Sequence, residues 1–201
     1  HPNNATDCWR RIEMMKILTQ WLKLTPHVWL YDYTPGFLVS GFVPERDVSN
    51  FAINAPIYKK IGLKGFGRQG SNTMMATWIS YYTSAKLMWD VHADVEAIKK
   101  DFYEQFFGKD AAPHIQAWWD ACESQLLKGT LHVHEDWLVN NLYTEEFAKS
   151  IHKYYEQAKK SHMTEEQNKR FRIFELIVEN FEAWTQMHES EKNMDYKKAK
   201  E

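Results

Sequence analysis

The chain has 201 residues, a formal net charge of −2 and an aromatic content of 15%. This length allows one large domain or two small ones with a real core. The near-neutral charge gives no basic surface, so nucleic acid is not an expected partner. No apolar run approaches the roughly 20 residues that a membrane-spanning helix needs. Two cysteines, Cys8 and Cys122, lie far apart without redox or zinc spacing and are expected to be independent thiols.

Helix and strand patterns alternate in the first half of the chain. In chain order they predict a helix over 7–24, a strand over 27–33, a helix over 53–61, a strand over 63–68 and a helix over 73–89. Thr6 or Asp7 would cap the first helix, and Pro26 prevents it from continuing. Gly62 is placed to end the second helix, as a glycine just past a helix does.

Only helices are predicted after Asp90. They cover 94–107, 111–127, 144–160 and 164 to beyond 184, with an irregular segment over 130–143 and a charged tail from 189. Asp94 and Thr144 precede helical runs as capping residues do, and Thr164 with Gln167 forms the spacing of a capping box.

The strand–helix–strand order with short links predicts a parallel βαβ unit. Parallel strands are normally covered on both faces, so Leu30, Leu63 and Phe66 are expected to be buried. We therefore expect an α/β part followed by an all-α part, namely the C-terminal end of a (β/α)8 TIM barrel followed by a helical domain. The expected divisions are 1–90 for the last βα units, 91–190 for the helical domain and 191–201 for a charged tail.

Several segments together resemble a known family. They are the LxxWL ending of the first helix, VWLYDY, KKIGLKGFGRQG, the long run from SAKLMWD to KDAAPHI, and LYTEEF. In this order the chain resembles the C-terminal half of the bacterial domain-of-unknown-function 4838 family of glycoside-hydrolase-like proteins, over roughly His1 to Trp184. Typical members have Tyr-Gly where this chain has Phe107-Gly108.

The resemblance has consequences for fold, activity and location. It implies barrels of the α-glucuronidase and N-acetylhexosaminidase kind, some with endo-β-N-acetylglucosaminidase activity, and a secreted, periplasmic or cell-surface location. The chain begins His1-Pro2 without an initiator methionine and is expected to be a piece of a longer protein. Its partners would then be a carbohydrate substrate and a missing N-terminal barrel portion of the same protein.

Candidate substrate-binding residues come from the two strand ends, because ligands of parallel sheets collect there. They are Tyr31, Asp32 and Tyr33 after the first strand, and Arg68 and Gln69 after the second. The tyrosines could stack on a sugar or donate hydrogen bonds, and arginine can bind a carboxylate through two parallel bonds. The structural alternatives are that Asp32 caps its loop and that Arg68 anchors one. Strand pleating sends Tyr31 and Tyr33 to one side and Asp32 to the other.

Catalytic residues are not apparent in this stretch. Glycosidic cleavage needs two carboxyl groups, and Asp32 is the one weak candidate, so the catalytic pair is expected upstream. His132-x-His134-Glu135 could pass for metal ligands, but the two histidines have no third ligand in pattern, and we expect no metal site there. No cofactor is expected, since GFGRQG lacks the residues of a phosphate-binding loop.

The resemblance therefore implies the C-terminal part of a glycoside hydrolase acting on glycans, with N-acetylglucosamine as the candidate sugar, whereas the residues alone indicate a parallel α/β end-piece with polar strand ends. This chain alone is expected to be inactive. The alternative is a non-catalytic carbohydrate-binding or interaction module, and a third possibility is a scaffold part that acts only beside the rest of its protein.

Overall fold

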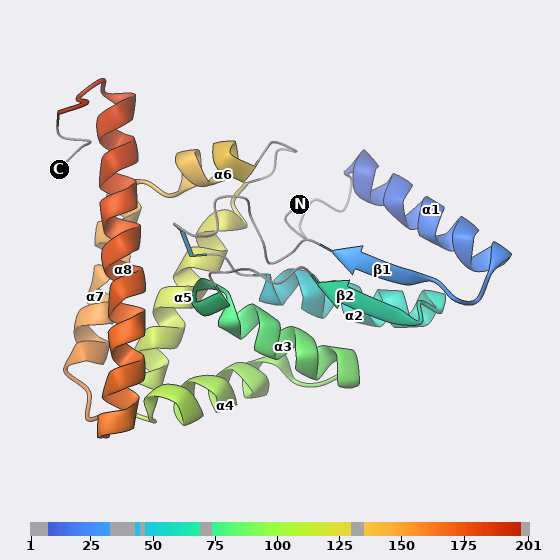
Figure 1. Cartoon of the computed structure of the whole chain (residues 1–201), viewed down its shortest axis with the longest axis horizontal. Helices are drawn as coiled ribbons and strands as arrows, with labels where there is room; N and C mark the ends of the chain where they lie inside the picture. Colours follow the sequence, from blue (N-terminus) through green and yellow to red (C-terminus); the bar gives the residue numbers. More distant parts are fainter. Residues whose placement is uncertain (1–7, 33–42, 45–46, 69–73, 130–134, 198–201) are drawn as a thin grey trace.

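The computed structural model describes residues 8–32, 43–44, 47–68, 74–129 and 135–197. Within these ranges the chain forms eight α-helices, one 3-10 turn and two short strands (Figure 1). In order they are α1 (Trp9–Leu24), β1 (Trp29–Asp32), α2 (Val48–Ile61), β2 (Gly65–Arg68), η1 (Met74–Ala76), α3 (Trp78–Trp89), α4 (Val95–Phe107), α5 (Ala112–Leu126), α6 (Glu135–Leu142), α7 (Glu145–Lys159) and α8 (Glu165–Lys192).

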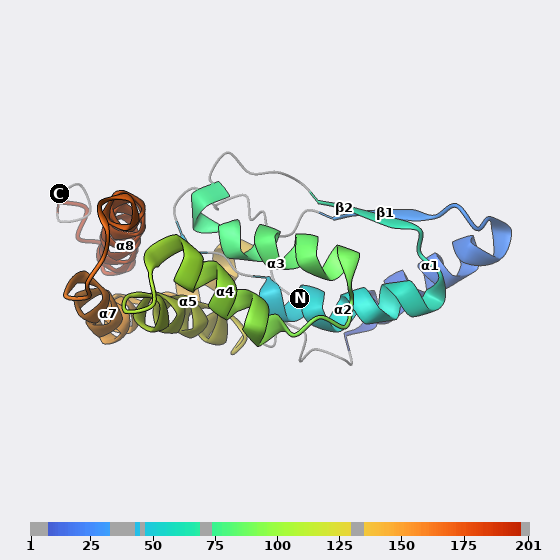
Figure 2. The same cartoon turned by 90° about the horizontal axis from the view of Figure 1, so that it is seen from below.

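The two strands pair in parallel, as the sequence predicts, with Trp29 opposite Gly65 and Asp32 opposite Arg68. Helices α2 and α3 lie on one side of this small sheet, and the other side of the sheet faces outward (Figure 2). On the outward face Trp29 and Tyr31 are 70% and 58% exposed. The sheet is therefore covered well on one face only.

The TIM-barrel prediction is wrong. The described residues are mostly helical, and their strands are four residues each in a two-stranded sheet. A barrel strand is buried on both faces, whereas β1 alternates between exposed and half-buried residues. Leu30, Leu63 and Phe66, which we expected to be buried, are each half-buried. The strand is apolar in composition, but within the described residues it is covered on one face, and Trp29 and Tyr31 are exposed on the other.

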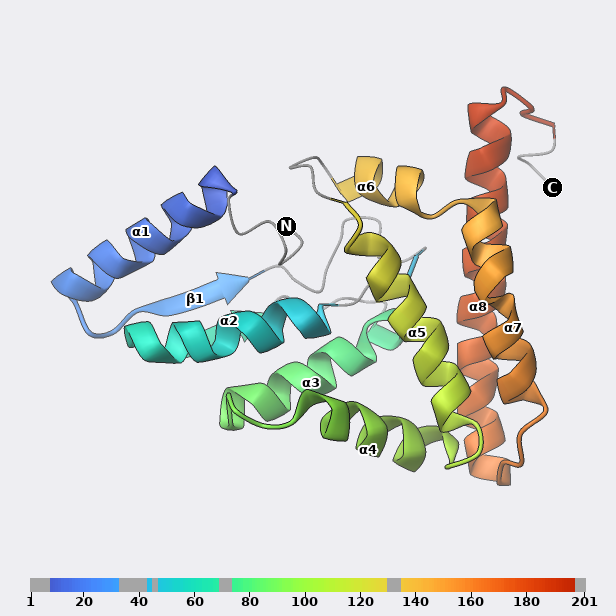
Figure 3. The same ribbon diagram turned by 180° about the vertical axis from the view of Figure 1, so that it is seen from behind.

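The main core lies among the helices instead. It gathers buried side chains from α3, α4, α5, α7 and α8, and Val43 and Val48 join it from the first half of the chain. Trp118 and Trp119 on α5 are both 0% exposed, and Trp118 packs edge-on against Phe174 of α8 with ring centroids 5.3 Å apart. Figure 3 shows α5, α7 and α8 side by side at one end of the molecule, with α1 and β1 at the other. The largest fully buried side chains of the described residues are aromatic ones in this helical part: Trp118, Trp119, Tyr103, Tyr143, Phe107, Phe174 and Phe181.

Several helix ends match the sequence closely. Gly62 ends α2 with a left-handed φ of 94°, and Asp94 accepts hydrogen bonds from two backbone N–H groups of α4. The capping box of α8 is complete, with both the Thr164 and Gln167 side chains bonded to backbone N–H groups. Thr144 caps α7 with its side-chain oxygen, which accepts a hydrogen bond from the Phe147 N–H. Local side-chain chemistry fixes these boundaries.

Other boundaries differ. Helix α2 begins at Val48, earlier than predicted, and Pro56 lies inside it. Glu135–Leu142 forms helix α6 where we expected an irregular segment, and α8 continues to Lys192 into the predicted tail. The proposed caps Thr6 and Asp7 lie outside the described residues. The domain divisions at 90 and 190 stay a prediction.

The capping box allows a simple test. Thr164→Ala removes the side-chain oxygen that the Gln167 N–H donates to at 3.3 Å. We expect a loss of about 1 kcal/mol in the free energy of unfolding, as for other N-cap truncations. Urea denaturation followed by circular dichroism measures it, and Thr164→Ser should retain most of the stability. Equal losses in the two variants would contradict the role of the hydroxyl.

Candidate functional site

The parallel register brings Asp32 and Arg68 together at the C-terminal ends of the two strands. Arg68 Nη2 lies 3.8 Å from Asp32 Oδ2. Their side chains differ in access, since 35% of the Asp32 side chain is exposed but only 3% of that of Arg68. Tyr33 and Gln69, which we also predicted at this edge, lie outside the described residues. Asp32 is thus the accessible member of the pair.

Arg68 is bound by one side chain just before α2 and by one on α3. Its Nη2 donates to Asp47 Oδ2, just before α2, and its Nη1 donates to Ser84 Oγ on α3. The guanidinium also stacks over the Phe51 ring, 4.7 Å from its centroid. Salt-bridged and stacked arginines of this kind have little freedom to move. Arg68 is therefore a buried residue that anchors the end of β2, as in the structural alternative in which it anchors a loop. Of the pair, Asp32 is the residue that is exposed to solvent.

Asp47 completes the ion cluster from inside the protein. It is 5% exposed, and its backbone N–H donates to Ser80 Oγ at 3.0 Å. Burial raises the pKa of the Asp47 carboxyl, and the neighbouring Arg68 opposes this by lowering it. Charging Asp47 therefore costs desolvation that Arg68 only partly offsets. Asp47 cannot meet a ligand from solvent, so its role is to fix Arg68.

Tyr58 on α2 borders the same cluster. Burial is the main cause that raises the pKa of Tyr58 to about 12, and the negative charge of Asp32 adds to it. Its hydroxyl is therefore protonated at neutral pH and can donate a hydrogen bond. The strand end thus combines the half-exposed carboxylate of Asp32 with the neutral hydroxyl of Tyr58 and the buried guanidinium of Arg68.

Tyr31 lies on the opposite face of the sheet from this cluster, as the alternation of the strand predicts. It neighbours Trp29 on that face, and each aromatic side chain lies over a glycine of β2. A Cβ built at Gly65 would overlap the Trp29 ring at 1.8 Å, and one at Gly67 would contact Tyr31 at 3.5 Å. Gly65 therefore has no room for a side chain. The structure separates Tyr31 from Asp32 and leaves Trp29 and Tyr31 as an exposed aromatic surface on the opposite face of the sheet.

Three partners of the site were missed by sequence reasoning. They are Asp47, Ser80 and Ser84. An aspartate just before an apolar run is a helix-start signal that would have placed Asp47 at the beginning of α2. The Ser80–Ser84 spacing of four residues puts both hydroxyls on one helix face, but nothing local indicates that Arg68 would meet them.

Metal binding finds no support in this part of the chain. Among the described residues no group of three or more histidine, cysteine, aspartate or glutamate side chains is arranged to hold a metal ion. His132 and His134 lie outside the described residues.

No described helix is long and apolar enough to cross a membrane.

Taken together, fold and site define a largely helical protein that carries a small parallel sheet with an ion cluster at its strand ends. Residues 1–120 match the family described as Domain of unknown function (DUF4838), so the chain belongs to this family. The matched region includes both strands, the ion cluster and helices α1 to α4. Comparison with curated proteins gave no match, and comparison with solved structures gave none either.

Proposed function

We propose that this chain is the glycan-binding C-terminal part of a glycoside hydrolase, with N-acetylglucosamine as the candidate sugar. The observation that carries the proposal is the Asp32 carboxylate, half-exposed at a strand end and held by a buried arginine. An ionised carboxylate accepts strong hydrogen bonds from hydroxyl groups, and a fixed one loses little entropy on binding. The sequence resemblance to glycoside-hydrolase-like proteins supports a sugar as the ligand.

Binding without cleavage is the expected activity of the isolated chain. Glycosidic hydrolysis needs two carboxyl groups that both reach the scissile bond. At this strand end Asp32 and Asp47 both contact Arg68, but Asp47 is buried. A substrate can therefore meet one carboxylate here, and a second would have to come from elsewhere in the protein.

Asp32→Asn tests the binding role. The variant loses the charge but keeps the shape, and Arg68 retains Asp47 as its partner, so the fold should persist. Because hydrogen bonds to charged groups contribute about 1.5–3 kcal/mol, the dissociation constant for N-acetylglucosamine oligosaccharides should rise by about tenfold or more. Isothermal titration calorimetry on the 201-residue chain measures it.

The matched control is Glu135→Gln, the same chemical change at the first residue of α6. It should leave the affinity within about twofold of wild type. In the full-length protein, Asp32→Asn should also impair turnover of N-glycan substrates more than Glu135→Gln does. Absence of sugar binding by wild type, or equal affinities of the two variants, would reject the proposal.

One observation favours the alternative of a non-catalytic interaction module. Trp29 and Tyr31 leave an aromatic sheet face exposed, and Trp9 and Trp21 on α1 are also more than half exposed. Large exposed apolar patches often mark protein interfaces. Under this alternative, Trp29→Ala would weaken a protein contact, whereas Asp32→Asn would leave sugar binding unchanged.

A further inference from the structure

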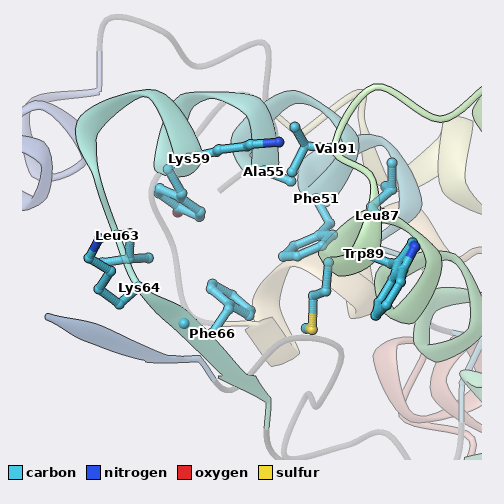
Figure 4. Close-up of a pocket in the computed structure, with 12 residues that line it drawn as sticks. Phe51, Ala55, Lys59, Leu63, Lys64, Phe66, Leu87, Trp89 and Val91 are labelled. Atoms are coloured by element: carbon cyan, nitrogen blue, oxygen red, sulfur yellow. The ribbon is translucent and has the colours of Figure 1, made fainter. Parts of the chain in front are cut away.

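A cavity lies beside the N-terminal end of β2 and shares Phe51 and Tyr58 with the surroundings of the ion cluster. It has a volume of about 390 Å³ and lies between α2, β2 and the end of α3 (Figure 4). Phe51 and Phe66 turn their rings into it, 4.9 Å apart, and the ring of Tyr58 lies 5.8 Å from that of Phe66. Pockets that bind small molecules typically have this size and an apolar lining. The lining is aromatic and suits a flat, apolar body.

The rim of this pocket has one sign of charge. Lys59 of α2 and Lys64 just before β2 are among the lining residues, and none of the described residues that line it is acidic. In Figure 4 the Lys59 side chain runs toward Ala55 and Val91, Lys64 lies beside Leu63, and Trp89 flanks the cavity from the side opposite to Lys64. A ligand with a negative group would meet lysine ammonium groups at the rim and no carboxylate among the lining residues.

The mouth of the pocket carries adaptable side chains. Met88 is 43% exposed and Trp89 is 93% exposed, both at the C-terminal end of α3. Methionine fills irregular space around a ligand, and an exposed indole can pack over one. We propose that this pocket binds a small anionic molecule that has a flat, apolar ring system, with the ring packed against the side chains of Phe51 and Phe66 and the anionic group at the rim that carries Lys59 and Lys64.

Two related dyes test the proposal on the 201-residue chain. The dye 1-anilinonaphthalene-8-sulfonate has the flat body and the negative charge, and N-phenyl-1-naphthylamine has the same body without the sulfonate. We expect the anionic dye to bind at one site, more tightly than the neutral dye. Fluorescence titration gives both dissociation constants.

Charge and shape are then varied separately. The double change Lys59→Gln and Lys64→Gln should weaken the anionic dye by about fivefold, because each exposed ion pair is weak, and should leave the neutral dye within about twofold. Lys60→Gln is the matched control, since Lys60 is exposed next to Lys59 but does not line the pocket. Met88→Glu should weaken both dyes, whereas Met14→Glu, at an exposed position on α1, should weaken neither.

Thermal melting confirms that each variant is folded before titration. The proposal is overturned if the double lysine variant binds the anionic dye as wild type does, or if Lys60→Gln has the same effect. It is also overturned if Met88→Glu and Met14→Glu weaken the dyes equally, since binding would then follow general surface hydrophobicity. These results are independent of sugar binding at Asp32.

Discussion

Replacing Arg68 with methionine is expected to lower the free energy of unfolding by about 3–5 kcal/mol, because it leaves a buried carboxylate without its counter-charge. Arg68 contacts Asp47, whose side chain is 7% exposed, and also the hydroxyl of Ser84. Methionine fills similar volume, so the loss comes mainly from the uncompensated charge. Urea denaturation followed by tryptophan fluorescence would measure it.

The pH dependence gives the same experiment a second readout. Burial already raises the pKa of Asp47 in the wild-type protein, and removing Arg68 raises it further. A group with a raised pKa in the folded state favours folding while it is protonated and loses this contribution as pH rises through that pKa. The deficit of Arg68→Met should therefore be largest near neutral pH and shrink as the pH falls toward 4, near the ordinary value for aspartate.

Two further variants separate charge from packing. Adding Asp47→Leu to Arg68→Met should recover much of the loss, since a buried ion pair can often be replaced by apolar residues. Arg172→Met is the exposed control; Arg172 pairs with Glu175 and Glu179 on the same helix, and its side chain is 56% exposed. That change should cost less than about 1 kcal/mol. A similar loss for Arg68→Met would show that the ion cluster does not hold the strand ends.

Truncation of Trp118 to alanine should destabilise the helical part by about 3–5 kcal/mol, as removal of a buried indole does. The side chain is 0% exposed on α5 and contacts three aromatic rings: those of Trp119, Phe174 and Phe181, with centroid distances of 5.0, 5.3 and 5.8 Å. Two of these rings belong to α8, so the cavity would open between α5 and α8.

Trp89→Ala is the matched control, because the same side chain is 93% exposed at the end of α3. It should change stability by no more than about 0.5 kcal/mol. Thermal and urea unfolding of the two variants, followed by circular dichroism, give the comparison. Equal losses at the two positions, or a loss below about 1 kcal/mol for Trp118→Ala, would contradict the position of the core.

Sequence reasoning succeeded where the signal is local. The caps at Asp94, Thr144 and Thr164 follow from side chains that bond neighbouring backbone groups, and Gly62 follows from its tolerance of a positive φ. The parallel pairing of the strands was also predictable, since a short helix between two apolar runs leaves few other topologies. The caps depend on residues close together in the sequence, and the strand pairing depends on the order of the elements.

The barrel prediction failed because it inferred a larger sheet from the apolar composition of two short strands. Apolar and aromatic residues in β1 suggested burial on two faces, but Trp29 and Tyr31 are exposed and Leu30 is half-buried. The periodicity of such a short run cannot show what covers each face. The aromatic residues that form the real core, such as Trp118, are distributed over helices whose packing partners lie far away in the chain.

Only part of the candidate site was predictable from the sequence. Asp32 and Arg68 could be placed together because the C-terminal ends of two parallel strands meet at one edge of the sheet. The burial of Arg68 could not be predicted, since it depends on how α2 and α3 pack against the sheet and bring Asp47 and Ser84 to the guanidinium. These contacts bury Arg68 and leave Asp32 as the partly exposed member of the pair.

The most direct test of the central claim is to map where a sugar binds. Backbone amide spectra of the isotope-labelled chain would be recorded by nuclear magnetic resonance during titration with N,N′-diacetylchitobiose. The account predicts shifts that concentrate at Tyr31, Asp32 and Arg68, that saturate with the sugar, and that disappear in Asp32→Asn. Saturable shifts confined to other elements, or no shifts at high sugar concentration, would contradict it.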